Sequence, residues 1–130
     1  MIPSVNELDL IARWNDARRT IVLAQLGPIF LLTSTIGLLQ FGLADTSLLV
    51  RLAAAGILLA TGVLGAVAQI SAAGEAGAAA RDLAASNPTS ALGRRVSASG
   101  RWVGIVTVGT PTIFVTIFLA LLVALLFPAN

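Results

Sequence analysis

The chain has 130 residues, of which 57% are hydrophobic and only 11% carry a charge, and its mean hydropathy is +0.94. Soluble domains carry about 25% charged residues, so this composition argues against a water-soluble protein and predicts an all-α integral membrane protein. The sequence has no Cys and no His, which removes thiolate sites and most haem and zinc sites, and the net charge is only +2. We therefore expect no catalytic residue, cofactor or metal, and no nucleic-acid partner.

The first predicted element is a short amphipathic helix over residues 4–19. Ser4 followed by Glu7 matches a capping box, a motif that starts helices. Apolar residues recur on one face of this segment at helical spacing, and charged residues occupy most of the other faces. A helix of this kind before a membrane span is expected to lie in the plane of the membrane surface, with Trp14 anchored among the headgroups. The sequence leaves open whether it continues straight into the span.

Three apolar segments follow, each longer than the ~20 helical residues that cross the ~30 Å hydrocarbon core. These predicted spans cover residues 20–43, 48–73 and 102–127, within one membrane domain over residues 1–130. A short polar turn, Gly42 to Ser47, connects the first two spans. Pro28 in the first span and Pro111 in the third predict helix kinks, because proline removes a backbone hydrogen-bond donor.

Residues 74–101, between the second and third spans, are predicted to form a helical hairpin outside the membrane. The Ala-rich first half favours a second helix that continues to about Ala85. Asn87 followed by Pro88 matches an N-cap with proline in the first helical position. A further helical piece is therefore expected to begin near Pro88 and to lead into the third span.

The arginines predict the orientation of the chain in the membrane. Seven of the eight basic residues, all arginines, lie before the first span or between the second and third spans, and only Arg51 lies elsewhere. The positive-inside rule then predicts a plasma (inner) membrane protein with a cytoplasmic N-terminus and an external C-terminus. Arg51 is expected to reach outward to the surface or to pair with Asp45.

Several residues at the predicted cytoplasmic surface are candidates for contact with lipids or partners. Basic side chains favour anionic headgroups or an acidic protein surface, and a tryptophan beside them favours the interface. The candidate contact residues are Arg18, Arg19, Arg94, Arg95 and Arg101, with Trp102 as a second interface anchor.

Small residues at three-to-four spacing along the second span predict close helix packing, because they let helix backbones approach each other. The partner helix is either within the chain or in another subunit, and the sequence does not separate these alternatives. The candidate packing residues are Gly56, Ala60, Gly62, Gly65, Ala66, Gln69 and Ala73.

Glu75 and Asp82 are the acidic residues near the inner end of the second span, seven residues apart and hence on nearly one helix face. This layout resembles that of the small prokaryotic diacylglycerol kinases, which have three spans and a surface helix. The resemblance implies a membrane enzyme with magnesium and nucleotide held by these carboxylates. The family's asparagine between the acids falls on Ala78, and its glutamate at the first span has no counterpart in this chain.

The predicted function is a non-catalytic small subunit that packs in a larger membrane assembly and stabilises it. The absence of ionisable residues deep in the spans argues against an ion or proton transporter, and the small-residue surfaces exceed what three helices need. The expected partners are membrane lipids and other membrane subunits. A homo-oligomeric pore, holin-like or pilus-like, is the first alternative, and an enzyme with the layout of diacylglycerol kinase is the second.

Overall fold

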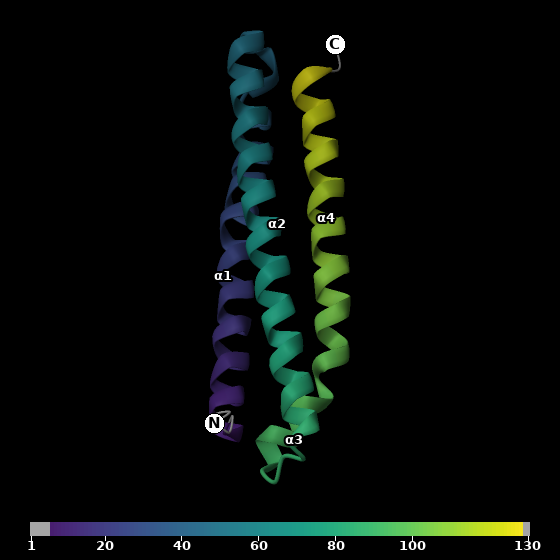
Figure 1. Cartoon of the computed structure of the whole chain (residues 1–130). Coiled ribbons are helices and arrows are strands. Elements are labelled where there is room, and N and C mark those ends of the chain that lie inside the picture. Colours follow the sequence, from purple (N-terminus) through teal and green to yellow (C-terminus); the bar gives the residue numbers. More distant parts are fainter. Residues whose placement is uncertain (1–5, 129–130) are drawn as a thin grey trace.

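The computed structural model describes residues 6–128 and is all-helical within this range (Figure 1). Three long helices lie side by side, and a short helix joins the second to the last. The elements in chain order are α1 (Glu7–Gln40), the 3-10 turn η1 (Leu43–Asp45), α2 (Leu48–Ala85), α3 (Ala91–Ala98) and α4 (Gly100–Leu126). We call the end of the bundle that carries α3 the α3 end, and the opposite end, which carries η1, the turn end.

Helices α1, α2 and α4 are long and apolar enough to cross a membrane, which confirms the predicted class of multi-pass, all-α protein. With 34 residues in α1 and 38 in α2, these two helices are about 50 and 57 Å long at 1.5 Å per residue. A hydrocarbon core of ~30 Å covers only part of that length. Both helices therefore extend well beyond the apolar layer, and their charged extensions lie at the α3 end.

The N-terminal segment differs from the expected separate surface helix. Residues 7–19 form the first turns of α1, which continues through Pro28 to Gln40 as one helix. Asn6 is the N-cap, and its side-chain oxygen accepts a hydrogen bond from the Leu8 backbone N–H at 3.3 Å. Ser4 of the expected capping box lies outside the described residues. The segment stays in line with α1 because its apolar face packs against α2 and α3 rather than against a membrane surface.

The segment after α2 also differs from the expectation. Asn87 does not cap a following helix: its φ of 51° is left-handed, and its N–H donates to the Ala84 carbonyl at 3.3 Å. Asparagine tolerates this conformation just past a helix end, so Asn87 and Pro88 terminate α2. Helix α3 begins three residues later than expected, at Ala91, where the Ser90 hydroxyl accepts from the Gly93 N–H at 2.9 Å.

At the turn end, Gly42 supplies the positive φ (93°) that reverses the chain between α1 and α2. Arg51, one turn into α2, donates from its guanidinium to the Leu125 carbonyl of α4 at 3.0 Å. The last carbonyls of a helix have no intrahelical partner and carry the negative end of its dipole. Arg51 therefore fastens the end of α4 to the start of α2, and Asp45, its expected partner, remains exposed.

Inside the apolar layer, α1 and α2 approach closely where Gly65 faces Pro28. A Cβ atom on Gly65 would lie 2.8 Å from Pro28 Cγ and 3.3 Å from the Ala24 carbonyl oxygen. Ala24 is the residue whose carbonyl loses its helical hydrogen bond to Pro28. Nearer the turn end, α4 joins the pair through an apolar cluster of Leu32, Ala55, Leu58, Leu121 and Leu125.

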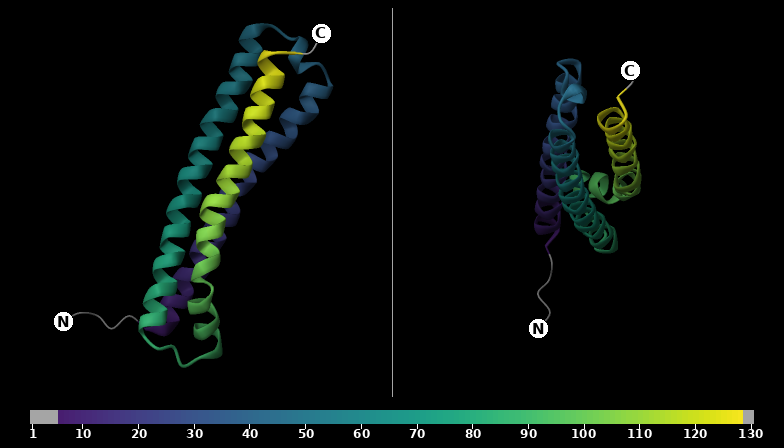
Figure 2. Two further views of the ribbon diagram at one scale, coloured as in Figure 1. Left: turned by 90° about the vertical axis from the view of Figure 1, so that its right-hand side faces the viewer. Right: turned by 90° about the horizontal axis from the view of Figure 1, so that it is seen from above.

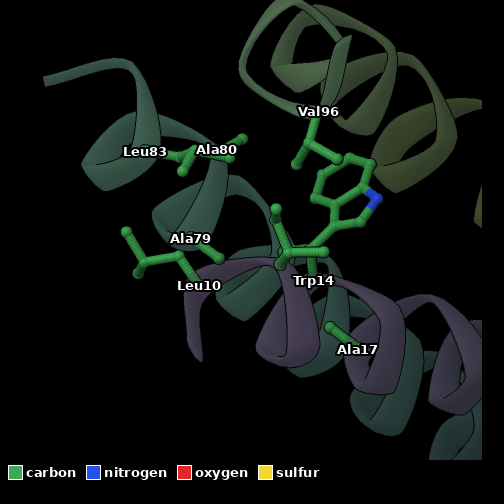
Figure 3. Close-up of a cluster of buried hydrophobic side chains, with 9 residues drawn as sticks. Leu10, Trp14, Ala17, Ala79, Ala80, Leu83 and Val96 are labelled. Atoms are coloured by element: carbon green, nitrogen blue, oxygen red, sulfur yellow. The ribbon is translucent and has the colours of Figure 1, made fainter. Parts of the chain in front are cut away.

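At the α3 end, a second apolar cluster joins α1, α2 and α3 around Trp14, as Figure 3 shows. Its buried members, which we call the Trp14 cluster, are Leu10, Ile11, Trp14, Ala17, Ala76, Ala79, Ala80, Leu83 and Val96. The small alanines of α2 leave room for the indole, which points toward Val96 of α3. Trp14 is only 7% exposed, so it packs inside the protein and is not the surface anchor expected from the sequence.

We predict that Gly65→Ala destabilises the bundle by about 1–3 kcal/mol, because the added methyl group overpacks the contact with Pro28. Gly62→Ala is the matched control on the same helix, since a Cβ there meets nothing within 4 Å. The measurement is equilibrium unfolding in mixed micelles on titration with sodium dodecyl sulfate, followed by Trp14 fluorescence in a Trp102→Phe background. Equal stability of the two variants would contradict the packing at Gly65.

Candidate functional site

The side chain of Glu7 connects the start of α1 to the start of α3. Its carboxylate accepts hydrogen bonds from the backbone N–H groups of Thr89 and Ser90, both at 3.2 Å, and from both hydroxyls. The first N–H groups of a helix have no intrahelical partner, and the helix dipole favours an anion there. Glu7 therefore caps α3 from 82 residues away in sequence rather than closing a capping box in its own helix.

Glycine at position 93 makes this contact possible. A Cβ atom on Gly93 would collide with the Glu7 carboxylate and would lie 2.8 Å from the Pro88 Cβ. The hydrogen bonds, the one from the Ser90 hydroxyl foremost, lower the pKa of the Glu7 carboxyl below its ordinary value. They favour the charged form of the carboxylate. This contact is a hydrogen-bonded latch between α1 and α3.

Glu75 and Asp82 border an open groove of about 620 Å³ between α1 and α2, together with Arg13 and Asp16. Within residues 6–128, no three acidic, histidine or cysteine side chains gather closely enough to hold a metal ion. The carboxylates of Glu75 and Asp82 share this groove with the Arg13 guanidinium and with a third carboxylate, that of Asp16.

The two prolines line one cavity of about 170 Å³ in the middle of the apolar layer, between α1, α2 and α4. Its walls are apolar except for Thr61 and Gln69. Gln69 is buried and donates from its amide to the Val106 carbonyl of α4 at 3.4 Å. A cavity with this lining is suited to hydrocarbon and offers no group that binds or transfers an ion.

The structure divides the predicted packing residues of α2 into two sets. Gly65, Ala66, Gln69 and Ala73 are half-buried or buried against the other helices. Gly56, Ala60 and Gly62 are exposed, and a Cβ on either glycine meets nothing within 4 Å. Gly56 and Gly65 lie nine residues apart, or two and a half turns, and therefore on opposite sides of α2.

The predicted basic contact residues are all exposed at the α3 end, but only two of them come together. Arg18 of α1 and Arg95 of α3 border a groove of about 670 Å³ that also includes Trp14 and Trp102. Trp102 is 69% exposed, whereas Trp14 forms an inner wall. Arg19, Arg94 and Arg101 are not among the lining side chains of this groove.

Sequence reasoning did not find the latch at Glu7 or the groove that Arg18 and Arg95 both border. Both depend on contacts between residues more than 70 positions apart. The signal for the latch was present in part: Thr89 and Ser90 precede a short amphipathic helix, which is a pattern typical of an N-terminus. Nothing local indicates that the acidic partner comes from the start of α1.

No protein-family model, no curated protein and no solved structure matches this chain. Three surfaces of the molecule therefore bear on its function. They comprise an exposed small-residue face on α2, an apolar cavity inside the bundle and a basic groove at the α3 end.

We predict that the Thr89 and Ser90 amide resonances titrate with the Glu7 carboxyl, at a pH below the usual glutamate range. Because the folded-state pKa of Glu7 is lowered, the latch stabilises the fold fully above the unfolded-state pKa. This contribution is lost as the pH falls through the lowered folded-state pKa. The measurement is the amide chemical shift in nuclear magnetic resonance spectra recorded from neutral to acidic pH.

Glu7→Gln should abolish this titration, because the amide side chain does not ionise. Asp9→Asn is the matched control, since it removes a carboxylate from the same turn of α1 and leaves the latch intact. A titration that persists in Glu7→Gln, or that disappears in Asp9→Asn, would show that another group controls these amides.

Proposed function

We propose that this chain is a non-catalytic small subunit of a larger membrane assembly, in which the outer face of α2 docks a helix of another subunit. The observation that carries the proposal is the exposure of Gly56 and Ala60, small residues four apart on the side of α2 that turns away from Gly65.

The outer face of α2 is suited to helix docking for a physical reason. Lipid chains are as apolar as leucine, so helices associate in a bilayer through close packing and hydrogen bonds. Small residues permit this close packing, and Ala53, three residues before Gly56, is also small and exposed. The bundle already uses Gly65 on the opposite side for its own α1–α2 contact. A helix from another chain would complete the outer face in the same way.

We further propose that the protein lies in the plasma (inner) membrane and that its α3 end faces the cytoplasm. Seven of the eight arginines belong to the α3 end by sequence position, and Arg51 is at the turn end. The positive-inside rule favours the arginine-rich side as cytoplasmic. The latch and the Trp14 cluster would then form the cytoplasmic part of the subunit, and the end of α4 would lie on the external side.

The test is native mass spectrometry of the tagged protein, extracted gently from its own membranes. We expect complexes with unlike subunits. The double variant Gly56→Leu and Ala60→Leu should reduce recovery of those subunits about tenfold or more, because bulk added to a packed contact costs about 1–3 kcal/mol. Gly104→Leu with Ala120→Leu adds the same bulk to exposed positions of α4 and is the matched control.

Three outcomes would overturn the proposal. One is recovery of the wild-type chain as a monomer, and another is equal loss of partners in both double variants. The third is a closed ring or polymer of this chain alone. That result would favour the homo-oligomeric alternative, with the outer face of α2 as the contact between copies.

A further inference from the structure

The groove bordered by Arg18 and Arg95 lies between α1 on one side and α3 with α4 on the other. The view from above in Figure 2 shows α2 between α1 and α4. Helix α2 contributes the side chain of Ala76 to the lining of the groove. The volume of the groove, about 670 Å³, is within the roughly 300–1,000 Å³ of small-molecule sites.

The chemistry of the groove changes along the bundle. Toward the α3 end it is bordered by the guanidinium groups of Arg18 and Arg95, with Asn15 and Ser99 beside them. Toward the middle of the bundle its walls are mainly the aliphatic side chains of Ile21, Val22, Val103 and Val106, with the amide of Gln25 at the inner end. The polar part therefore lies where the first and third spans meet the membrane surface, and the apolar part lies within the hydrocarbon layer.

The two arginines of the groove are free to bind an anion. Of the arginines within residues 6–128, Arg51 and Arg94 donate hydrogen bonds to backbone carbonyls from their guanidinium groups. Arg18 and Arg95 form no such bond in this part of the chain, and no carboxylate lines the groove. Guanidinium groups bind phosphate with two parallel hydrogen bonds, and basic pockets between helices on the cytoplasmic side suit phospholipid headgroups.

We propose that this groove is a binding site for one anionic phospholipid, with its phosphate at Arg18 and Arg95 and an acyl chain along the aliphatic walls. The positive charge of the arginines suits the anionic headgroup, and the aliphatic part of the groove suits the acyl chain. A soluble anion would leave the aliphatic walls unused, and a zwitterionic lipid would bring an ammonium group close to the guanidinium groups. The proposal rests on the three spans and does not depend on the subunit proposal.

Trp14 is a suitable reporter, because it borders the groove but is shielded from its surroundings. The chain has two tryptophans, so Trp102→Phe leaves Trp14 as the sole fluorophore. This variant is reconstituted in phosphatidylcholine bilayers, and brominated phosphatidylglycerol is titrated in at increasing mole fraction. The bromine is placed on the acyl chain next to the glycerol, because Trp14 lies on the headgroup side of Arg18 and bromine quenches only an indole that it approaches. We expect quenching of Trp14 at lower mole fraction with brominated phosphatidylglycerol than with brominated phosphatidylcholine.

Arg18→Gln with Arg95→Gln should raise the mole fraction of phosphatidylglycerol needed for half-maximal quenching on the order of 20-fold, since each arginine at a lipid surface contributes roughly fivefold. Arg19→Gln with Arg81→Gln removes the same charge from exposed positions of the α3 end that do not line the groove, and should shift the quenching curve much less. Far-ultraviolet circular dichroism checks that each variant is folded.

Equal quenching by the two brominated lipids would overturn the proposal, as would equal effects of the two double variants. A groove filled by a helix of another protein chain would give no preferential quenching in the purified protein, and is therefore also a contradicting outcome. The readout involves no other subunit, so its failure would leave the docking face on α2 untouched.

Discussion

The burial of Trp14 and its neighbours from water is the interaction on which the rest of the structure depends. The hydrophobic effect requires water, so it contributes little between helices inside a bilayer. The extensions of α1 and α2 beyond the apolar layer are where it can act, and there Leu10, Trp14 and Leu83 become buried. This cluster sets the register of α1 against α2 and positions α3 beneath them. Within the apolar layer, close steric packing holds the helices together instead, most clearly where Gly65 accommodates Pro28.

Helix α4 is held differently from the other two. Its contacts with α1 are much less extensive than those between α1 and α2. Polar side chains of α2 reach its backbone at two heights, Gln69 at the Val106 carbonyl and Arg51 at the Leu125 carbonyl. Both the apolar cavity and the basic groove open between α4 and the α1–α2 pair. The loosely packed side of the bundle is thus also the side with room for another molecule.

The sequence predicts the three spans well, because long uncharged runs have few alternatives in an all-helical membrane protein. It fails where a residue's role depends on a distant partner. A tryptophan such as Trp14 suits either a membrane surface or a protein interior. It is buried in this fold because the small alanines of α2 leave room for it. Asparagine occurs at both ends of helices, so the sequence alone does not show whether Asn87 begins or ends one. Its left-handed φ shows that it ends α2. Gly56 and Gly65 belong to the same small-residue pattern in the sequence. Only the packed structure shows that Gly65 contacts Pro28 whereas the space beside Gly56 is open.

The bond from Arg51 to Leu125 also has a consequence for the order of biogenesis. The two residues are 74 positions apart, and a chain is made from its N-terminus, so α2 enters the membrane long before Leu125 is synthesised. During that interval the guanidinium must be solvated by water and lipid phosphates at the membrane surface. When α4 inserts, the hydrogen bond from Arg51 to the Leu125 carbonyl replaces this solvation. Arg51 therefore couples the insertion of α4 to closure of the bundle at the turn end.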